Sequence, residues 1–238
     1  MGLFDFLLSE EKKIKKHHRR LNNRDAQPED RELSARWLAD NGSPQALLAL
    51  LSRFDMQNVE HQLKDAGEKE LVYALIAEHG DRAIEPLVSW LRVCKQVAQP
   101  LRLLEDLTTP DQAVEVVFGL LEQERKRDDF KPGKKKKLLI WLADQRHDGA
   151  IEAAMPFLAD FDEGVRYAAA EVIIGQEDEA GREPLLEVLS NPEEESNRLK
   201  VRIAEVFANR RWSIAEVPEV ADRLPNGYAV RDVRIVSA

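Results

Sequence analysis

The stretch GDRAIEPLVSWL, residues 80–91, returns in closely related form as HDGAIEAAMPFL, residues 147–158. In both, an alanine and a branched apolar residue are followed by further apolar residues three or four positions apart, which is the spacing of one face of an α-helix. The same alanine recurs at intervals of 30 to 37 residues, at Ala46, Ala83, Ala113, Ala150 and, in weaker form, Ala180 and Ala215. A period in the thirties is typical of an array of supersecondary units.

Residues that can accept hydrogen bonds from the free amides of a first helical turn precede most of these alanines. The candidates are Ser43, Asp81, Thr109, Asp148 and Asp178. A second apolar helix pattern precedes each of these starts, and its WLAD motif occurs at both 37–40 and 141–144. The repeated unit is therefore predicted to be a pair of antiparallel helices.

A single helix pair of this size cannot bury its apolar stripe, whereas stacked pairs share a continuous core. We therefore predict an all-α fold, a right-handed α-solenoid of about six stacked antiparallel helix pairs over residues 25–224. Residues 1–24 are predicted to be a basic amphipathic N-terminal arm or capping helix. Residues 225–238 are predicted to be a C-terminal tail, and the two-residue alternation in YAVRDVRIV, residues 228–236, leaves its conformation open.

The fifth unit, FDEGVRYAAAEVIIGQEDEAGREPLLEVL at 161–189, resembles a HEAT repeat. It has Asp162, Val165 and Arg166 at the start of its first helix and Pro184 in its second helix. The resemblance implies a HEAT-like array, in which the second helices line the concave face. Arrays of this family usually act as scaffolds and docking surfaces, although HEAT-like repeats also occur in phycobilin lyases and DNA glycosylases.

The predicted second helices carry a row of acidic residues. Glu85, Glu115 and Glu152 occupy the same register in three successive units, and Glu187 adds to the acidic character. With helices packed about 8 to 10 Å apart, these carboxylates are expected to form a ladder on the concave face. Such a surface favours a partner protein with a basic surface, while the alternative is that the residues only keep the array soluble.

Two basic patches contrast with the formal net charge of −9. In the first, residues 10–24, the candidate basic contacts are Lys12, Lys13, Lys15, Lys16, Arg19 and Arg20. With Leu7, Ile14 and Leu21 at heptad spacing, this segment can cap the array, remain a disordered arm, or make peripheral contact with an anionic membrane. In the second, residues 126–137, the candidates for phosphate-backbone contact are Lys134, Lys135, Lys136 and Lys137. The alternative for the second patch is a solvated loop.

The sequence offers no signature of catalysis or of a cofactor. GKKKK at 133–137 lacks the earlier glycine and the Ser or Thr of a phosphate loop, and no His or Cys pair has the spacing of a metal site. The single cysteine, Cys94, favours a reducing compartment, so we expect a cytoplasmic protein. Trp90 is expected to pack between neighbouring layers, because the equivalent positions hold other large apolar residues.

These observations predict a non-enzymatic, protein-binding adaptor or scaffold that uses no cofactor and no metal. The alternative is a nucleic-acid-binding protein with the architecture of HEAT-like DNA glycosylases, which would use the local basic patches. The acidic second helices and the negative net charge make nucleic acid the less favoured partner.

Overall fold

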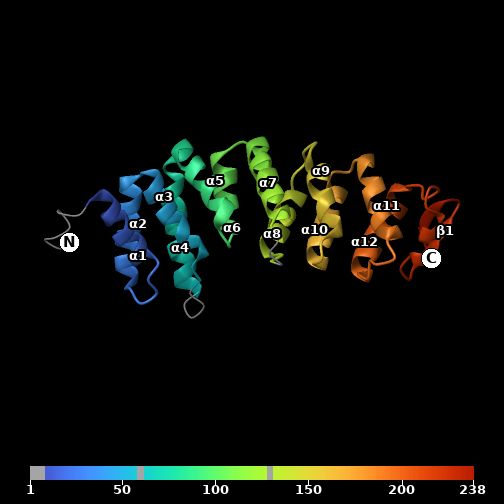
Figure 1. Cartoon of the computed structure of the whole chain (residues 1–238), viewed down its shortest axis with the longest axis horizontal. Helices are drawn as coiled ribbons and strands as arrows, with labels where there is room; N and C mark the ends of the chain where they lie inside the picture. The colour runs from blue at the N-terminus through green and yellow to red at the C-terminus, as the bar shows by residue number, and fades with distance from the viewer. Residues whose placement is uncertain (1–8, 58–61, 128–130) are drawn as a thin grey trace. The chain divides into compact units, whose positions relative to one another are not determined.

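The computed structural model describes residues 9–57, 62–127 and 131–238, and these residues are mostly helical (Figure 1). The chain divides into two compact units, Met1–Val116 and Val117–Ala238, which we call unit 1 and unit 2. None of the described helices has both the length and the apolar character that crossing a bilayer requires. The predicted all-α character is therefore confirmed at the level of secondary structure, apart from one short hairpin described below.

Unit 1 is built from helices joined by short turns. The helices are α1 (Glu10–Leu21), α2 (Pro28–Asn41), α3 (Pro44–Leu51), α4 (Gln62–Ala77), α5 (Ile84–Val93) and α6 (Ala98–Leu107), with 3-10 turns η2 (Ser52–Asp55) and η4 (Gly80–Ala83). Helix α7 (Pro110–Arg125) begins in this unit. The first helices α2, α4 and α6 pack in series, and α3 packs on α5. Successive predicted pairs are thus stacked within unit 1.

The predicted helix starts are correct where a side chain accepts a hydrogen bond from an amide of the first turn. Ser43 Oγ accepts a hydrogen bond from the Ala46 amide at 3.3 Å, at the start of α3. At α7, the Thr109 hydroxyl caps the Gln112 amide while the Gln112 side chain caps the Thr109 amide. Asp81, by contrast, lies inside the 3-10 turn η4, so its predicted role as a cap is wrong.

Buried charges tie α2, η2 and α4 together. The Arg53 side chain is 2% exposed and lies 2.6 Å from Asp65 and 3.0 Å from Glu68. Arg31 donates to the other oxygen of Glu68 at 2.7 Å. Burial alone would raise the pKa of Glu68, but the hydrogen bonds from both arginines outweigh it and hold the pKa below its usual value. This network fixes the first helices of two successive pairs to each other.

Unit 2 contains the rest of α7 and the remaining elements. They are α8 (Gly133–Ala143), α9 (Ala150–Ala154), η5 (Met155–Ala159), α10 (Glu163–Gly175), η6 (Glu179–Gly181), α11 (Arg182–Ser190), α12 (Asn197–Arg210), η7 (Pro218–Arg223), β1 (Tyr228–Arg231) and β2 (Arg234–Ser237). The first helices α8, α10 and α12 again pack in series. Asp162, Asp178 and Ser196 cap the starts of α10, η6 and α12, whereas Gly149 takes the cap position of α9 in place of the expected Asp148.

The predicted C-terminal tail is a folded β-hairpin. Strands β1 and β2 pair antiparallel, with Tyr228 opposite Ser237, and β2 packs on α12. Ile235 is 1% exposed. After α12 the chain forms only the 3-10 turn η7 before this hairpin, so the sixth predicted pair lacks a second α-helix. The weak repeat position Ala215 is exposed in this segment. Ala180 is also exposed, in η6, although the second helix of its pair, α11, is present.

Two glycines are expected to respond to alanine in opposite directions. A Cβ on Gly175 in α10 would lie 2.9 Å from the Ala143 carbonyl oxygen of α8, whereas nothing lies within 4 Å of a Cβ on Gly67 in α4. We expect Gly175→Ala to lower the free energy of unfolding by about 1–3 kcal/mol, because backbone must move. Gly67→Ala should raise it by about 0.5–1 kcal/mol. Urea denaturation followed by circular dichroism measures both, and a Gly175→Ala protein of unchanged stability would contradict the close approach of α8 and α10.

Candidate docking groove

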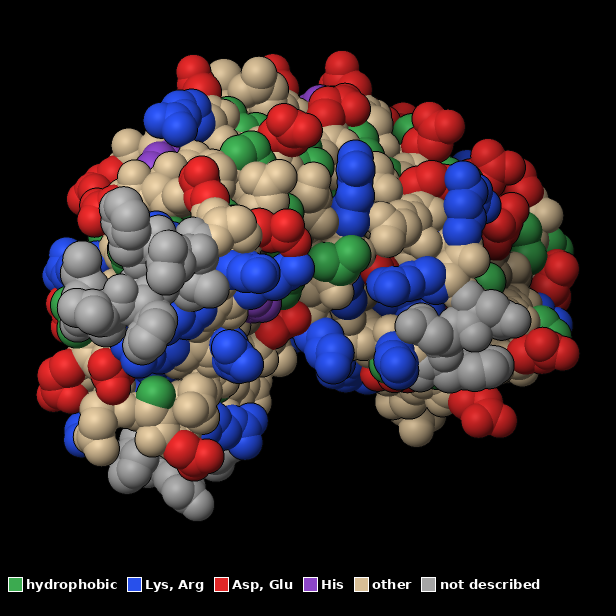
Figure 2. All heavy atoms as spheres, turned by 60° about the vertical axis from the view of Figure 1, so that its left-hand side comes forward, with side chains coloured by type: hydrophobic (Ala, Val, Ile, Leu, Met, Phe, Trp, Pro, Cys, Tyr) green, Lys and Arg blue, Asp and Glu red, His purple; other side chains and the backbone are tan. Residues whose placement is uncertain are grey.

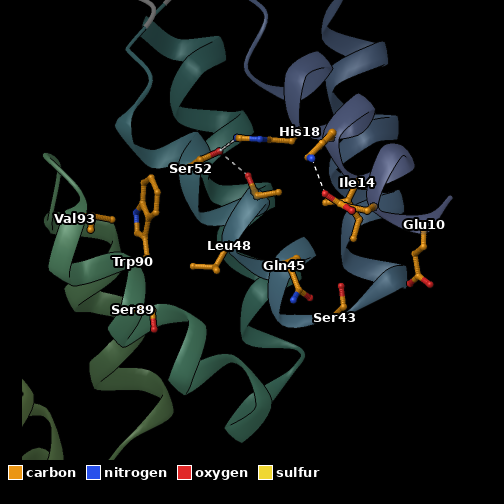
Figure 3. Close-up of a pocket in the computed structure, with 13 residues that line it drawn as sticks. Glu10, Ile14, His18, Ser43, Gln45, Leu48, Ser52, Ser89, Trp90 and Val93 are labelled. Atoms are coloured by element: carbon orange, nitrogen blue, oxygen red, sulfur yellow. Dashed lines mark hydrogen bonds and ion pairs between the residues drawn. The ribbon is translucent and has the colours of Figure 1, made fainter. Parts of the chain in front are cut away.

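A groove of about 1010 Å³ lies on unit 1 and is lined by α1, α3 and α5 (Figure 3). Most of its lining surface is apolar, contributed by Ile14, Leu48, Ala49, Trp90 and Val93. In the close-up, Trp90 and Val93 stand on one side, Ile14 and His18 on the other, and Leu48 lies between them. Three segments that are distant in sequence therefore form one apolar surface.

The helical register explains why apolar side chains face this groove. On α5, Leu87 and Leu91 are fully buried in the core, while Trp90 is half-buried and Val93 is 66% exposed. Leu48 on α3 is likewise half-buried. These residues lie outside the core stripe of their helices, so they leave an apolar patch at the surface. The expectation that Trp90 packs between layers is therefore replaced by a position in the groove wall.

A serine and a histidine meet in the groove, but not as a nucleophile and its base. The Ser52 hydroxyl donates its only proton to the Ala49 carbonyl oxygen at 2.6 Å. The Asn22 side-chain amide donates to Ser52 Oγ at 2.6 Å, and His18 Nε2 lies 2.9 Å from the same oxygen. With the hydroxyl proton directed at Ala49, Ser52 Oγ accepts from His18 in the tautomer that carries its hydrogen on Nε2. In that tautomer the imidazole cannot remove the serine proton, and the contact joins α1 to η2.

The charged groups of the groove are also engaged with one another. His18 is exposed, and the partial desolvation of its ring in the groove lowers its pKa below the ordinary 6.5, which favours the neutral imidazole at pH 7. The hydrogen bond and charge of Lys15 lower the pKa of Glu11, which lies one helical turn away. Glu10 accepts a hydrogen bond from Asn41 at 2.8 Å. Apart from these rim groups the groove presents a mainly apolar surface, which suits an apolar occupant.

The first basic patch forms a helix that packs on unit 1. Helix α1 lies against α2 and α3 and buries Leu21, which is 1% exposed. The side chains of Lys12, Lys15, Arg19 and Arg20 are exposed, and those of Lys13 and Lys16 are half-buried. Leu7, with which the expected heptad begins, lies outside the described residues. The described part of the segment, from Glu10 to Leu21, therefore belongs to unit 1 as a packed helix.

The second basic patch is not the exposed surface that the sequence suggested. Lys134 and Lys135 are each 9% exposed. Lys134 lies 3.4 Å from the buried Glu124, and Lys135 forms an ion pair with Asp160 at 2.5 Å. Buried lysines are stable when they are paired in this way, so these two hold α8 in unit 2 rather than face a partner. Only Lys136 and Lys137 of the predicted four are exposed.

All four predicted acidic docking residues are exposed. Glu85 on α5 and Glu115 on α7 belong to unit 1, and Glu152 on α9 and Glu187 on α11 belong to unit 2. On the face drawn in Figure 2, Asp and Glu side chains lie among Lys and Arg side chains, and hydrophobic side chains reach the surface only in small patches. The role of Glu85, Glu115, Glu152 and Glu187 in binding a partner stays a prediction.

Leu48 and Val93 were missed by sequence reasoning, and Trp90 was given another role, although a signal was present. Leu48 and Val93 are apolar, yet they stand outside the three- and four-residue spacing that marks the core face of their helices. An apolar residue off that face is a candidate for contact with another molecule.

Among the described residues, no three His, Cys, Asp or Glu side chains are grouped so that they could hold a metal ion.

Comparison with known proteins bears on the repeat itself. No curated protein matches the chain closely enough to count as a relative. Residues 165–191 match the family model of the PBS lyase HEAT-like repeat. The matched residues span most of α10 and all of α11, and they include Arg166 and Pro184, on which the resemblance to a HEAT repeat was based. The chain therefore contains a HEAT-like repeat, which α10 and α11 form.

Proposed function

We propose that the protein is a non-enzymatic adaptor or scaffold that docks a segment of a partner protein on the outer surface of its second helices. The observation that carries this proposal is the apolar groove of unit 1, where Leu48, Trp90 and Val93 face outward from α3 and α5. Apolar patches with a polar rim mark interaction sites on proteins of known function. A groove of this kind accommodates the apolar face of an amphipathic partner helix.

We take the scaffold to be the predicted right-handed α-solenoid of about six helix pairs, the last of which has α12 but no second α-helix. Two observations support it: the pairs α2–α3 and α4–α5 stack as layers within unit 1, and the pair α10–α11 matches a HEAT-like repeat. Arrays of this class present extended binding surfaces because each unit repeats the same outward face.

The partner in this proposal has a basic surface as well as an apolar segment. Glu85 is exposed on α5, the helix that also contributes Trp90 and Val93 to the groove, and Glu115 is exposed on α7. In unit 2 the corresponding residues are Glu152 and Glu187. Charges beside an apolar contact chiefly set the association rate and the choice of partner. We propose a cytoplasmic location for this function, on the ground that the sequence has a single cysteine, Cys94, which is buried.

The nucleic-acid alternative has less support, because only Lys136 and Lys137 of its four candidate contacts in the second basic patch are exposed. Two of its candidate contacts, Lys134 and Lys135, are committed to Glu124 and Asp160. A phosphate contact would have to break these buried ion pairs.

A charged residue in the groove is expected to abolish docking. We expect Val93→Asp to reduce partner capture at least about tenfold, because it buries an unpaired carboxylate at the contact. Val93 is 66% exposed in the free protein, so the fold should tolerate the change. The matched control is Val233→Asp, which makes the same change at a valine that is 51% exposed in unit 2. Affinity capture from the native source, quantified by mass spectrometry for both variants and the unchanged protein, makes the comparison.

Equal capture of the same proteins by all three forms would refute docking in the groove. The acidic component is tested separately by Glu85→Lys with Glu115→Lys. The control is Asp40→Lys with Glu78→Lys, at exposed positions on α2 and in the turn after α4. If only Val93→Asp lowers capture, the groove remains the docking site and the acidic residues are not part of it.

A further inference from the structure

We propose that the groove of unit 1 binds the chain's own N-terminal segment, MGLFDFLL at residues 1–8, in cis. The segment then competes with the partner protein, and this competition alone rests on the proposed function. Residues 1–8 lie outside the described residues. The groove, the start of α1 beside it and the sequence of the segment support the proposal.

The segment is attached at the edge of the groove. Glu10 and Glu11, the first two residues of α1, both line it, and only Ser9 separates them from residue 8. The hydrogen bond between Glu10 and Asn41 holds this end of α1 against α2. A short tether of this kind gives a local concentration in the millimolar range, so even a weak apolar contact is populated.

The segment is long enough to cross the groove. Eight residues in an extended conformation span at most about 26–29 Å. Helix α1 packs on α3, and α3 packs on α5, and helix axes in contact are about 8–10 Å apart. Crossing from α1 over α3 to α5 therefore requires roughly 20 Å, which lies within reach. Val93 and Trp90 on α5 are therefore accessible to the N-terminal half of the segment, residues 1–4, when the chain is extended.

The chemistry of the segment matches that of the groove. Its large side chains are apolar apart from Asp5, and include Phe4 and Phe6. The groove offers Ile14, Leu48 and Val93. Apolar surface on both sides gains by leaving water together. The positive charges of α1 leave the groove mainly apolar. Lys15 forms an ion pair with Glu11, and the exposed Lys12 and Arg19 do not line the groove.

A disulfide cross-link tests the position of the segment directly. In a Cys94→Ala background, Phe4→Cys is combined with Val93→Cys, and the purified full chain at micromolar concentration is oxidised with diamide, which takes up the two thiol hydrogens. The matched control combines Phe4→Cys with Leu63→Cys, because Leu63 is 92% exposed on α4 and does not line the groove. We expect an intramolecular cross-link, seen as a faster monomer band on a non-reducing gel, to form at least tenfold faster with Val93→Cys.

Equal rates for the two pairs would overturn the proposal. A predominant covalent dimer would overturn it in favour of binding to a second copy. A membrane is the other competitor for the segment: if no cross-link forms and the full chain, but not a chain lacking residues 2–8, sediments with phosphatidylserine vesicles, the segment serves as a membrane contact instead.

A second measurement separates this inference from the proposed function. The synthetic peptide MGLFDFLL with a fluorescent label should bind the chain lacking residues 2–8 at least tenfold more tightly than the full chain, in which the groove is occupied. If the peptide and cross-link results hold while Val93→Asp leaves partner capture unchanged, the segment binds the groove but the proposed function is wrong. If Val93→Asp lowers capture and the cross-link fails, the function stands and the inference is wrong.

Discussion

Replacing Arg166 by methionine is expected to lower the free energy of unfolding by about 3–5 kcal/mol at neutral pH. Arg166 forms a two-point ion pair with Glu194, with nitrogen to oxygen distances of 2.7 and 2.9 Å, and the Glu194 side chain is 3% exposed. Arg166 also donates to the carbonyl oxygen of Asp160 at 2.9 Å. The variant leaves a buried carboxylate without its counter-ion, and the loss of that partner dominates the effect.

The pH dependence of the same variant is a sharper test. In the native protein, burial alone would raise the pKa of Glu194, but the hydrogen bonds from Arg166 and from the Ser196 amide hold it below the ordinary value of 4.5. This ion pair therefore stabilises the native protein above pH 4.5 and loses its effect as the pH falls through the lowered pKa. In Arg166→Met, burial is no longer opposed by arginine, so Glu194 takes up a proton at higher pH.

The stability deficit of Arg166→Met should consequently be largest at pH 7 and should shrink below pH 4.5. Urea denaturation at several pH values measures it. Arg146→Met is the matched control, since its ion pair with Glu177 is 65% and 63% exposed. Removing such a surface pair changes stability by only about 0–1 kcal/mol. A deficit that does not vary with pH would show that Arg166 acts through packing rather than through the charge of Glu194.

Replacing Phe207 by alanine should have a comparable effect, again about 3–5 kcal/mol. Phe207 on α12 is fully buried, and its ring meets the ring of Trp212 edge to face, with centroids 5.2 Å apart. Helix α12 also supports the C-terminal hairpin through β2. Loss of the ring leaves a cavity between the helix and the segment that follows it, because Trp212 and the backbone of α12 can only partly collapse into the space.

Phe161→Ala supplies the control for Phe207→Ala. Phe161 belongs to the same unit but is 54% exposed, with Lys135 Nζ 4.9 Å from its ring centroid. An exposed contact of that kind contributes only about 0.5–1 kcal/mol. Urea denaturation followed by tryptophan fluorescence measures both variants. Similar losses for the two phenylalanines would contradict the placement of Phe207 in the core of unit 2.

The helix pairs could be predicted because their determinants are local. The apolar spacing that begins at Ala46 and Ala113 depends on residues within one or two turns, and Ser43 and Thr109 act within three residues. The same applies to the HEAT-like repeat, whose matched residues form two adjacent helices. A periodic pattern and its cap are both contained in a single stretch of sequence.

Other features could not be predicted because they depend on contacts between distant residues. The burial of Lys134 and Lys135 requires Glu124 and Asp160, which lie 10 and 25 residues away, on other elements. The groove forms because Ile14 on α1 and Trp90 on α5 lie on either side of α3, and no local sequence pattern predicts that arrangement. The acidic residues were identified as exposed because charge alone predicts exposure, but exposure alone does not identify a partner.

The β-hairpin on α12 has a consequence for self-assembly. Helix pairs that stack have compatible faces, so an uncovered pair can accept a helix pair of another copy, and repeated head-to-tail addition produces a fibre. Strands do not offer the ridges and grooves that another helix pair needs, so the surface of α12 that β2 covers is closed to such an addition. Arg231 and Arg234, opposite each other beside the hairpin turn, also place like charges where a neighbouring strand would have to pair.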